Sequence, residues 1–345
     1  MKIRVVEKTY DEVMAMPRDP HVRPAKQIRF LRFLVRWLSF LELRKANFQY
    51  RKIGMEDIDQ TQPCLYLMNH SSFIDLKIAF TILRKNPFNI VCTSDGFVGK
   101  NWLMRRLGCI STKKFITDIT LVSDMVYAVK KLNSSILMYP EASYSFDGTA
   151  TPLPEGLGKC IKMLKVPVVM IRTYGAFQRD PLYNGLQIRK VDVSAEMKCI
   201  LGKDELANMS VEEINDILTR EFSFDQFKWQ QEHGVCVNEP FRADGLNRVL
   251  YKCPNCQTEG KMHGKGVYLT CGHCNKRYLL TEQGYIKAEE GKTEFDHIPD
   301  WYRWQRECVR EELEKGTYRL DVPVDILMMV NTRAVYRIGT GRLLH

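Results

Sequence analysis

The first strongly patterned stretch of the chain is Ile28–Leu43, with the sequence IRFLRFLVRWLSFLEL. On a helix, at about 100° per residue, Arg29, Arg32 and Arg36 fall within one narrow arc, and aromatic and aliphatic residues fill the other side. The pattern therefore predicts an amphipathic helix with a broad apolar face and a cationic stripe.

From about residue 60, short apolar runs alternate with longer stretches of helical periodicity. Short apolar runs are typical of buried strands, and their alternation with helices predicts an α/β domain with a mixed, largely parallel sheet flanked by helices. The expected strands are Cys64–Met68, Asn89–Thr93, Ser135–Tyr139, Val166–Ile171 and Ile188–Val193, and the expected helices are Asp75–Leu83, Asp118–Leu132 and Gly158–Leu164.

The composition changes near residue 240. The chain becomes glycine-rich with paired cysteines, and a charged helix (Ile298–Lys315) and an apolar strand pair (Asp321–Arg337) are expected after them. We therefore expect five segments: a polar leader (1–27), the amphipathic helix (28–48), the α/β domain (49–235), a small β-rich module (245–285) and a helix followed by β structure (296–345).

Charge is concentrated in one place. The 345 residues include 51 Lys and Arg against 41 Asp and Glu, a net charge of +10, and the 45% share of hydrophobic residues is that of a globular protein. Residues 22–52 alone hold nine Lys and Arg and one acid. A local positive block of this kind indicates contact with an anionic surface, either lipid or nucleic acid.

Three further features bear on location. No window of about 20 uncharged apolar residues exists, so we expect no transmembrane helix. Met1–Tyr10 is charged with no apolar core behind it, so we expect no secretory signal and a protein that stays in the cytoplasm. The odd number of cysteines, 11, fits free thiols and a metal site in a reducing compartment rather than a disulfide framework.

Candidate catalytic residues follow the first expected strand, in the turn Asn69–Asp75 (NHSSFID). His70 and Asp75 would lie about 140° apart on one continuous helix, so they can meet only if His70 lies on the turn and Asp75 in the first helical turn. There the carboxylate could accept the Nδ1 proton and leave Nε2 as a base. The hydroxyl that completes such a triad would belong to the substrate.

A second polar turn, Tyr139–Ser145 (YPEASYS), follows another apolar strand. The carboxyl ends of parallel strands meet at one edge of the sheet, which is where α/β folds bind ligands. We therefore expect the two turns to contribute to one site.

Together the turns resemble motifs of the glycerolipid acyltransferase family, of the lysophosphatidic acid acyltransferase (PlsC-like) type. Asn69, His70 and Asp75 match its first motif, and Tyr139–Ser145 is similar to its third, an aromatic-Pro-Glu-Gly-Thr-Arg-Ser turn. Its second and fourth motifs are matched by Gly108–Phe115, loosely, and by 166–169. The resemblance covers roughly residues 28–230 and implies an acyltransferase-type fold for the α/β domain.

The resemblance implies an O-acyltransferase of phospholipid synthesis. A fatty acyl group would move from acyl-CoA or acyl-carrier protein to the hydroxyl of a lysophospholipid, a 1-acylglycerol-3-phosphate-like acceptor, with no organic cofactor beyond the acyl donor. His70 would be the general base and Asp75 would orient it. The implied acceptor-binding residues are Asn69, Lys113, Lys114, Pro140, Glu141 and Ser143, of which the two lysines would face the acceptor phosphate.

Two positions depart from the family pattern. Ala142 stands where the family has glycine, and Tyr144 where it has the arginine usually assigned to phosphate contact. A neutral phenol cannot replace the fork of a guanidinium group. The acceptor is therefore left open between a phosphate-bearing lysolipid and another lysolipid or alcohol.

Amphiphilic substrates require access to a bilayer. Ile28–Leu43 suits an interfacial helix, with aromatic residues for the acyl boundary and arginines for anionic headgroups. The alternative is a helix packed on the protein's own core with its arginines outward. The positive block favours an anionic membrane surface, and we expect a peripheral protein on the cytoplasmic face of the membrane.

The cysteine spacing predicts a zinc ribbon. Cys253 and Cys256 are followed, after fourteen residues, by Cys271 and Cys274, and four thiolates fill a tetrahedral site. We therefore expect one structural Zn²⁺.

A second hypothesis remains open beside the enzyme: a non-catalytic lipid-binding protein, or a nucleic-acid or protein-interaction protein acting through a basic ribbon. We do not expect nucleic acid as a partner, because the basic excess lies near the amphipathic helix instead.

Overall fold

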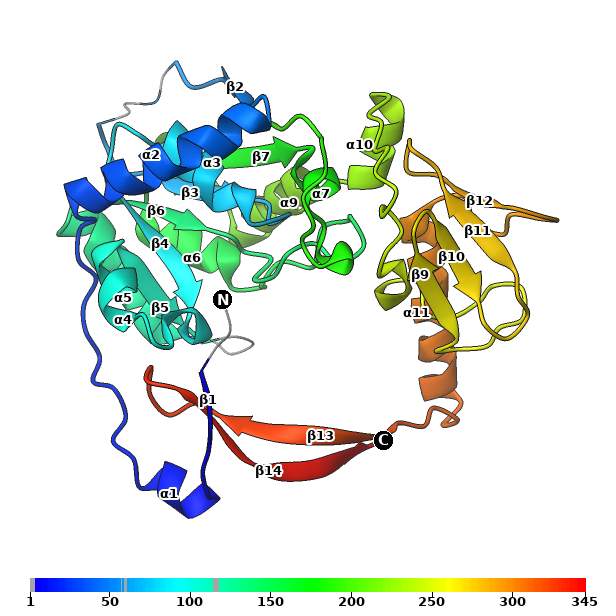
Figure 1. Cartoon of the computed structure of the whole chain (residues 1–345). Helices are drawn as coiled ribbons and strands as arrows, with labels where there is room; N and C mark the ends of the chain where they lie inside the picture. The colour runs from blue at the N-terminus through cyan, green and yellow to red at the C-terminus, as the bar shows by residue number, and fades with distance from the viewer. Residues whose placement is uncertain (1–3, 57, 59–60, 114–117) are drawn as a thin grey trace.

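The computed structural model describes residues 4–56, 58, 61–113 and 118–345. Within these residues the chain forms sheets of seven, four and three strands (Figure 1). The seven-stranded sheet has the order β2-β8-β7-β3-β6-β4-β5. Its strands are β2 (Gln49–Ile53), β3 (Leu65–Met68), β4 (Phe88–Thr93), β5 (Cys109–Thr112), β6 (Ser135–Met138), β7 (Val168–Tyr174) and β8 (Ser194–Leu201).

The predicted α/β class is confirmed. Neighbouring strands of the large sheet pair in parallel, except β7 with β8, which pair antiparallel. The predicted strand Ile188–Val193 is wrong: this segment is irregular, Ile188 is exposed, and the strand is β8 instead. The first half of β8 alternates partly exposed and buried positions, and Glu196 and Lys198 interrupt its apolar residues, so the strand has no long apolar run for the sequence to reveal.

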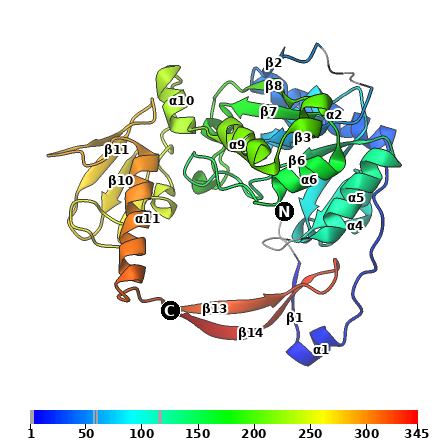
Figure 2. The same ribbon diagram turned by 180° about the vertical axis from the view of Figure 1, so that it is seen from behind.

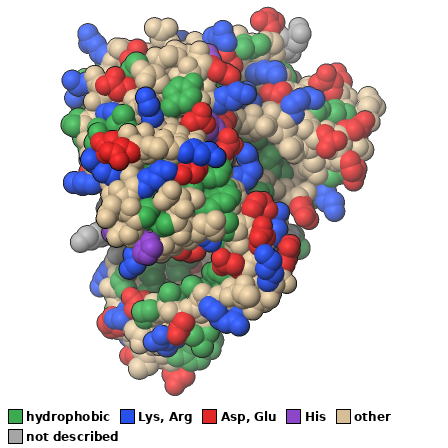
Figure 3. Space-filling model, turned by 90° about the vertical axis from the view of Figure 1, so that its right-hand side faces the viewer, with side chains coloured by type: hydrophobic (Ala, Val, Ile, Leu, Met, Phe, Trp, Pro, Cys, Tyr) green, Lys and Arg blue, Asp and Glu red, His purple; other side chains and the backbone are tan. Residues whose placement is uncertain are grey.

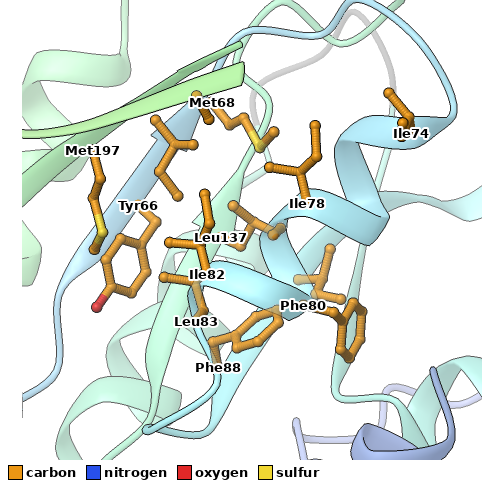
Figure 4. Close-up of a cluster of buried hydrophobic side chains, with 14 of the residues drawn as sticks. Tyr66, Met68, Ile74, Ile78, Phe80, Ile82, Leu83, Phe88, Leu137 and Met197 are labelled. Carbon is orange, nitrogen blue, oxygen red and sulfur yellow. The ribbon is translucent and has the colours of Figure 1, made fainter. Parts of the chain in front are cut away.

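Helices cover both faces of this sheet (Figures 1 and 2). Tyr66 and Met68 of β3 belong to the core under α3, whereas Leu65 and Leu67 belong to the core under α5, α6 and α9, because successive strand residues point to opposite faces. Figure 4 shows Ile74 and the apolar side of α3 on the first of these cores. The helices of the domain are α2 (Arg29–Lys45), α3 (Ile74–Ile82), α4 (Asn101–Arg106), α5 (Ile119–Lys130), α6 (Leu157–Leu164), α7 (Ala176–Arg179), α8 (Lys203–Asn208), α9 (Val211–Phe222) and α10 (Gln226–Glu232).

Helix α2 presents its apolar face to solvent. Ser39 and Leu43 are buried against the domain, and one nitrogen of Arg32 donates to the carbonyls of Arg84 and Asn86 just beyond α3. Part of the expected cationic stripe therefore contacts protein, the reverse of a helix packed with its arginines outward. More than half of each of the following side chains is exposed: Phe30, Phe33, Trp37, Leu38, Phe40 and Leu41.

The paired cysteines lie in a four-stranded antiparallel sheet, ordered β12-β11-β10-β9. We call residues 251–288 the cysteine module; its strands are β9 (Met262–Lys265), β10 (Tyr268–Cys271), β11 (Arg277–Leu280) and β12 (Ile286–Ala288). Helix α11 (Ile298–Glu314) packs on it through the fully buried Trp301, whose indole N–H donates to the carbonyl of Lys252 at 2.9 Å. The helix and the module thus share one core.

The third sheet joins segments from the two ends of the sequence. Strand β1 (Val5–Glu7) pairs in parallel with β14 (Val335–Leu344), which pairs antiparallel with β13 (Asp321–Met328) (Figure 1). The segment expected as a polar leader contains β1 and α1 (Tyr10–Met14), and the expected strand pair near the C-terminus is found. The connection between β13 and β14 contacts the α/β domain, where the amide of Gly99 donates to the carbonyl of Thr332 at 2.8 Å.

Candidate active site and cysteine cluster

The first predicted turn brings His70 and Asp75 together. The turn leaves β3 and enters α3, so that Asp75 lies in the first turn of the helix. His70 Nδ1 is 3.2 Å from Asp75 Oδ2, and the same oxygen accepts the backbone N–H groups of Ser71 and Ser72 at 2.7 and 2.9 Å. The carboxylate therefore orients the ring while it satisfies amides at the start of the helix.

The His70 ring contacts two aromatic rings. Its centroid lies 4.2 Å from that of Tyr139 and 4.3 Å from that of Tyr144. The His70 side chain is 22% exposed, whereas that of Asp75 is fully buried. With Nδ1 facing the carboxylate, and no partner for Nε2 among the described residues, Nε2 is the nitrogen that can accept a proton.

Glu141 joins the second turn to the first. Its two carboxylate oxygens accept the backbone N–H groups of His70, at 2.8 Å, and Thr151, at 3.1 Å. The amide of Ser145 donates to the carbonyl of His70 at 2.7 Å. Burial raises the pKa of Glu141. Glu141, predicted in the acceptor pocket, is therefore engaged with the backbone and holds the two turns together.

The other predicted binding residues differ in accessibility. The side-chain oxygen of the buried Asn69 accepts a hydrogen bond from the backbone N–H of Thr173 in β7 at 2.8 Å. Asn69 therefore links the ends of β3 and β7. Pro140 is buried and Ser143 is exposed. Lys113 is exposed just after β5, three strands away from β3, which is about 14 Å at normal strand spacing. Lys114 lies outside the described residues.

Both departures from the family pattern have structural counterparts. Ala142 has a φ of +58°, a left-handed backbone conformation that favours glycine, the residue the family has there. Burial raises the pKa of Tyr144 to about 12, so its phenol is neutral at ordinary pH. The ring beside His70 is thus uncharged.

Near this pair lies a second buried carboxylate, Asp180, which is not among the residues predicted from the sequence. Asp180 follows α7 and is 4% exposed, and its Oδ1 lies 3.8 Å from Arg179 Nη1, which is 3.5 Å from Glu42 of α2. Burial raises the pKa of Asp180 to about 7, and Asp75 adds to the rise. An Arg-Asp pair just after a strand parallel to β3 is the signal that could have found it, because parallel strands end at the same sheet edge.

Asp180 gives a testable dependence of stability on pH. Because its folded-state pKa of about 7 lies above the ordinary 3.8, the protonated form stabilises the fold below about pH 4, and this contribution is lost as the pH rises through 7. Between pH 4 and 8 the unmodified protein should lose on the order of 4 kcal/mol more unfolding free energy than Asp180→Asn. Urea unfolding across this range measures it, with the exposed Asp216→Asn as control. Equal slopes for the protein and Asp180→Asn would contradict the assignment.

The four predicted cysteine ligands converge. The Sγ atoms of Cys253, Cys256, Cys271 and Cys274 all lie within 4.8 Å of one another, and this is the one such group of possible metal ligands among the described residues. Cys253 and Cys274 are 3.8 Å apart at sulfur, and Cys256 and Cys271 are 3.7 Å apart. Four sulfurs at about 2.3 Å from a tetrahedral Zn²⁺ would be about 3.8 Å apart, so the cluster fits that ion.

The two cysteine turns have the same backbone design. The amide of Gln257 donates to the carbonyl of Cys253 at 2.8 Å, and the amide of Asn275 donates to that of Cys271 at 2.9 Å. Both Gln257 and Asn275 have positive φ, 58° and 61°. Each turn thus places its two thiols on the same side, which a tetrahedral site made from two pairs requires.

Comparison with known proteins supports an acyltransferase-like domain. Residues 26–173 match the family model described as Acyltransferase. A chloroplastic 1-acyl-sn-glycerol-3-phosphate acyltransferase of Brassica napus is 27% identical over 144 residues, 40% of this chain and 40% of its own. The 1-acyl-sn-glycerol-3-phosphate acyltransferase beta of Homo sapiens is 24% identical over 123 residues, 35% of this chain and 44% of its own.

The extent of these matches is limited. The chain spans about two fifths of the length of the curated relatives it matches. The structural match to the crystal structure of the 1-acyl-sn-glycerophosphate acyltransferase PlsC from Thermotoga maritima covers 56% of this chain and 79% of the PlsC chain. Its TM-score is 0.43, and the two sequences are 14% identical. Among the described residues no helix is both long enough and apolar enough to cross a bilayer. The part of the chain that contains both predicted turns, residues 26–173, is thus similar to acyltransferases.

Proposed function

We propose that the protein is an O-acyltransferase that moves a fatty acyl group from a thioester, acyl-CoA or acyl-carrier protein, to the hydroxyl of a lysophospholipid. The observation that carries the proposal is the contact of His70 Nδ1 with the buried Asp75, which leaves Nε2 of a partly exposed ring available as a base. The acyltransferase family match over the same residues supports it.

The reaction would proceed in two steps. As the acceptor hydroxyl oxygen attacks the thioester carbonyl carbon, His70 Nε2 takes the hydroxyl proton, and Asp75 stabilises the resulting imidazolium. The tetrahedral intermediate then collapses, the carbon–sulfur bond breaks, and the departing thiolate takes the proton from His70. An ester and a free thiol are the products, and no covalent bond to the enzyme is formed.

The proposed acceptor is a 1-acylglycerol-3-phosphate-like lysolipid. The names of the two curated relatives support this substrate class, although Tyr144 offers no positive charge beside His70. Release of free thiol from an acyl thioester, measured with a panel of lysolipids with and without a phosphate, tests both the activity and the acceptor. A lack of thiol release above the rate without acceptor, across the panel, would contradict the proposal.

We further propose that α2 holds the protein on an anionic membrane at its cytoplasmic face. Its outward side chains are aromatic and aliphatic, and Arg29 and Arg36, seven residues apart, lie along one edge of this apolar face. The helix packs on α3, which carries Asp75, and Glu42 of α2 pairs with Lys77 of α3. A bilayer bound to α2 would thus lie close to the candidate catalytic pair.

Membrane binding should depend on the apolar face of α2. Replacing Phe30, Phe33 and Trp37 by serine removes three side chains that are 60–67% exposed, so the fold should survive while affinity for anionic vesicles falls about a hundredfold or more. Co-sedimentation with vesicles measures it. The matched control places serine at Ile326, Leu327 and Leu344, which are also exposed. Equal binding by both variants would contradict the assignment of α2.

For the cysteine module we propose one structural Zn²⁺ held by its four thiolates. A role in nucleic-acid binding is less well supported, because four of the six Lys and Arg side chains of the module are ion-paired: Lys252 with Glu312, Lys265 with Asp244, Lys276 with Glu294 and Arg277 with Glu289. On the face of the molecule that carries the module, acidic and basic side chains are interspersed (Figure 3).

A further inference from the structure

A pocket of about 180 Å³ lies between α11 and the loop that follows the second turn. It is separate from the His70–Asp75 pair and from the cysteine cluster. One wall is the loop, through Asp147 and Thr149, and the other is one face of α11. The helix contributes Pro299, Tyr302, Arg303, Arg306, Glu307 and Arg310.

The face of α11 that lines the pocket is held in place from behind. Arg303, Arg306 and Arg310 follow one another at helical spacing, so they share a side of the helix. On the opposite side of the helix, Trp301 is buried in the module. The Gln305 side chain accepts a hydrogen bond from the backbone N–H of Lys252 and donates one to the carbonyl of Val249, both at 2.9 Å. The three guanidinium groups therefore project from a fixed helix.

The pocket has more positive than negative charge. Arg303 pairs with Asp300 at 2.7 Å and Arg310 with Glu307 at 2.9 Å, while Arg306 has no ion-pair partner in the described parts of the chain. The carboxylate of Asp147 accepts hydrogen bonds from the backbone N–H and the hydroxyl of Thr149, at 3.0 and 2.7 Å. Three guanidinium groups thus face two lining carboxylates, and Arg306 is available to an anion.

The pocket is connected to the candidate catalytic turn by two hydrogen bonds. The amide of Ser145 donates to the carbonyl of His70 at 2.7 Å, and the hydroxyl of Ser145 donates to the carbonyl of Thr149 at 2.8 Å. Thr149 is a wall of the pocket. An anionic group in the pocket and a reacting group at His70 would therefore lie at two ends of one short loop.

We propose that this pocket binds the phosphate of the acyl donor's pantetheine arm, with Arg306 as its principal contact. The inference rests on the proposed function. A coenzyme A thioester and a carrier-protein thioester share one chemistry: the thioester is at one end of a pantetheine chain and a phosphate at the other. A donor of this kind needs a phosphate site apart from the reacting centre, and guanidinium groups are suited to phosphate oxygens.

The test compares two single charge removals, one on α11 and one at its C-cap. Arg306→Gln should raise the KM for the acyl donor about tenfold, the loss expected for one charged hydrogen bond, and leave kcat and the KM for the acceptor unchanged. Lys315→Gln removes the same charge about 180° around the helix axis and should change none of these values. Acyl-CoA and acyl-carrier protein are assayed separately, so the donor whose KM rises identifies the source of the phosphate.

Direct binding separates this inference from the proposed function. Calorimetry of coenzyme A and of holo-carrier protein, without any acceptor, needs no turnover. Weaker binding of either probe by Arg306→Gln but not by Lys315→Gln supports the pocket even if no acyl transfer is ever detected. Acyl transfer with the same donor KM in both variants, or no binding of either probe to the unmodified protein, would overturn the inference, and the first of these outcomes leaves the proposed function intact.

Discussion

His70→Ala is expected to lower acyl transfer by roughly three orders of magnitude or more at saturating substrates, because the acceptor hydroxyl would lose its base. The ring makes one side-chain hydrogen bond among the described residues, to Asp75, so the variant should remain folded. Release of free thiol from the donor gives the rate, and circular dichroism checks the fold. The exposed His233→Ala serves as the matched control and should keep its full rate.

Asp75→Asn distinguishes a catalytic pair from an isolated histidine. The neutral asparagine amide cannot offer the charged hydrogen-bond acceptor that the carboxylate gives to the Nδ1–H group. The ring should therefore lose its orientation, and the rate should fall by a similar factor. A normal rate for His70→Ala would exclude His70 as the base and with it the proposed mechanism. A normal rate for Asp75→Asn alone would mean that the ring is oriented by its two tyrosine neighbours.

Cys253→Ser is expected to remove the metal and unfold the cysteine module. Binding of Zn²⁺ to four thiolates contributes about 10 kcal/mol or more to the folding of small zinc domains, and the module has only short strands to replace it. Elemental analysis should find one zinc per chain in the unmodified protein and close to none in the variant. Limited proteolysis should then cut within residues 251–288, because the core that Trp301 shares with the module would open.

The matched control for this experiment is Cys236→Ser. Cys236 is exposed and lies outside the cluster, so its replacement should change neither the zinc content nor the proteolysis pattern. Proteolytic resistance of Cys253→Ser, or of the unmodified protein after treatment with a chelator, would show that the module folds without metal.

The sequence was most informative where spacing alone imposes geometry. Two cysteine pairs fourteen residues apart predicted a cluster whose sulfurs do converge. For His70 and Asp75, the reasoning that one must lie on a turn and the other in the first helical turn describes the observed arrangement, although their catalytic roles remain predictions. In both places the interacting groups are close in sequence or belong to short repeated turns.

It was least informative where contacts join distant segments. Asp180 lies more than a hundred residues from Asp75, and only the sheet order places β7 beside β3. The direction in which α2 faces could not be predicted either, because an amphipathic pattern does not say which side contacts the protein. Arg32 points toward the protein because it donates hydrogen bonds to backbone carbonyls just beyond α3. Hydrophobic periodicity carries no information about such backbone acceptors.

The pairing of β1 with β14 has a consequence for biosynthesis. Val5 lies opposite Val335, 330 residues further along the chain, so β1 leaves the ribosome long before its partner strand emerges. Contacts so distant in sequence form slowly, and the unpaired edge of β1 is open to other strands in the meantime. We therefore expect nascent chains to hold this strand without a partner until β14 has been translated, and chaperones would have the opportunity to act on it during that interval.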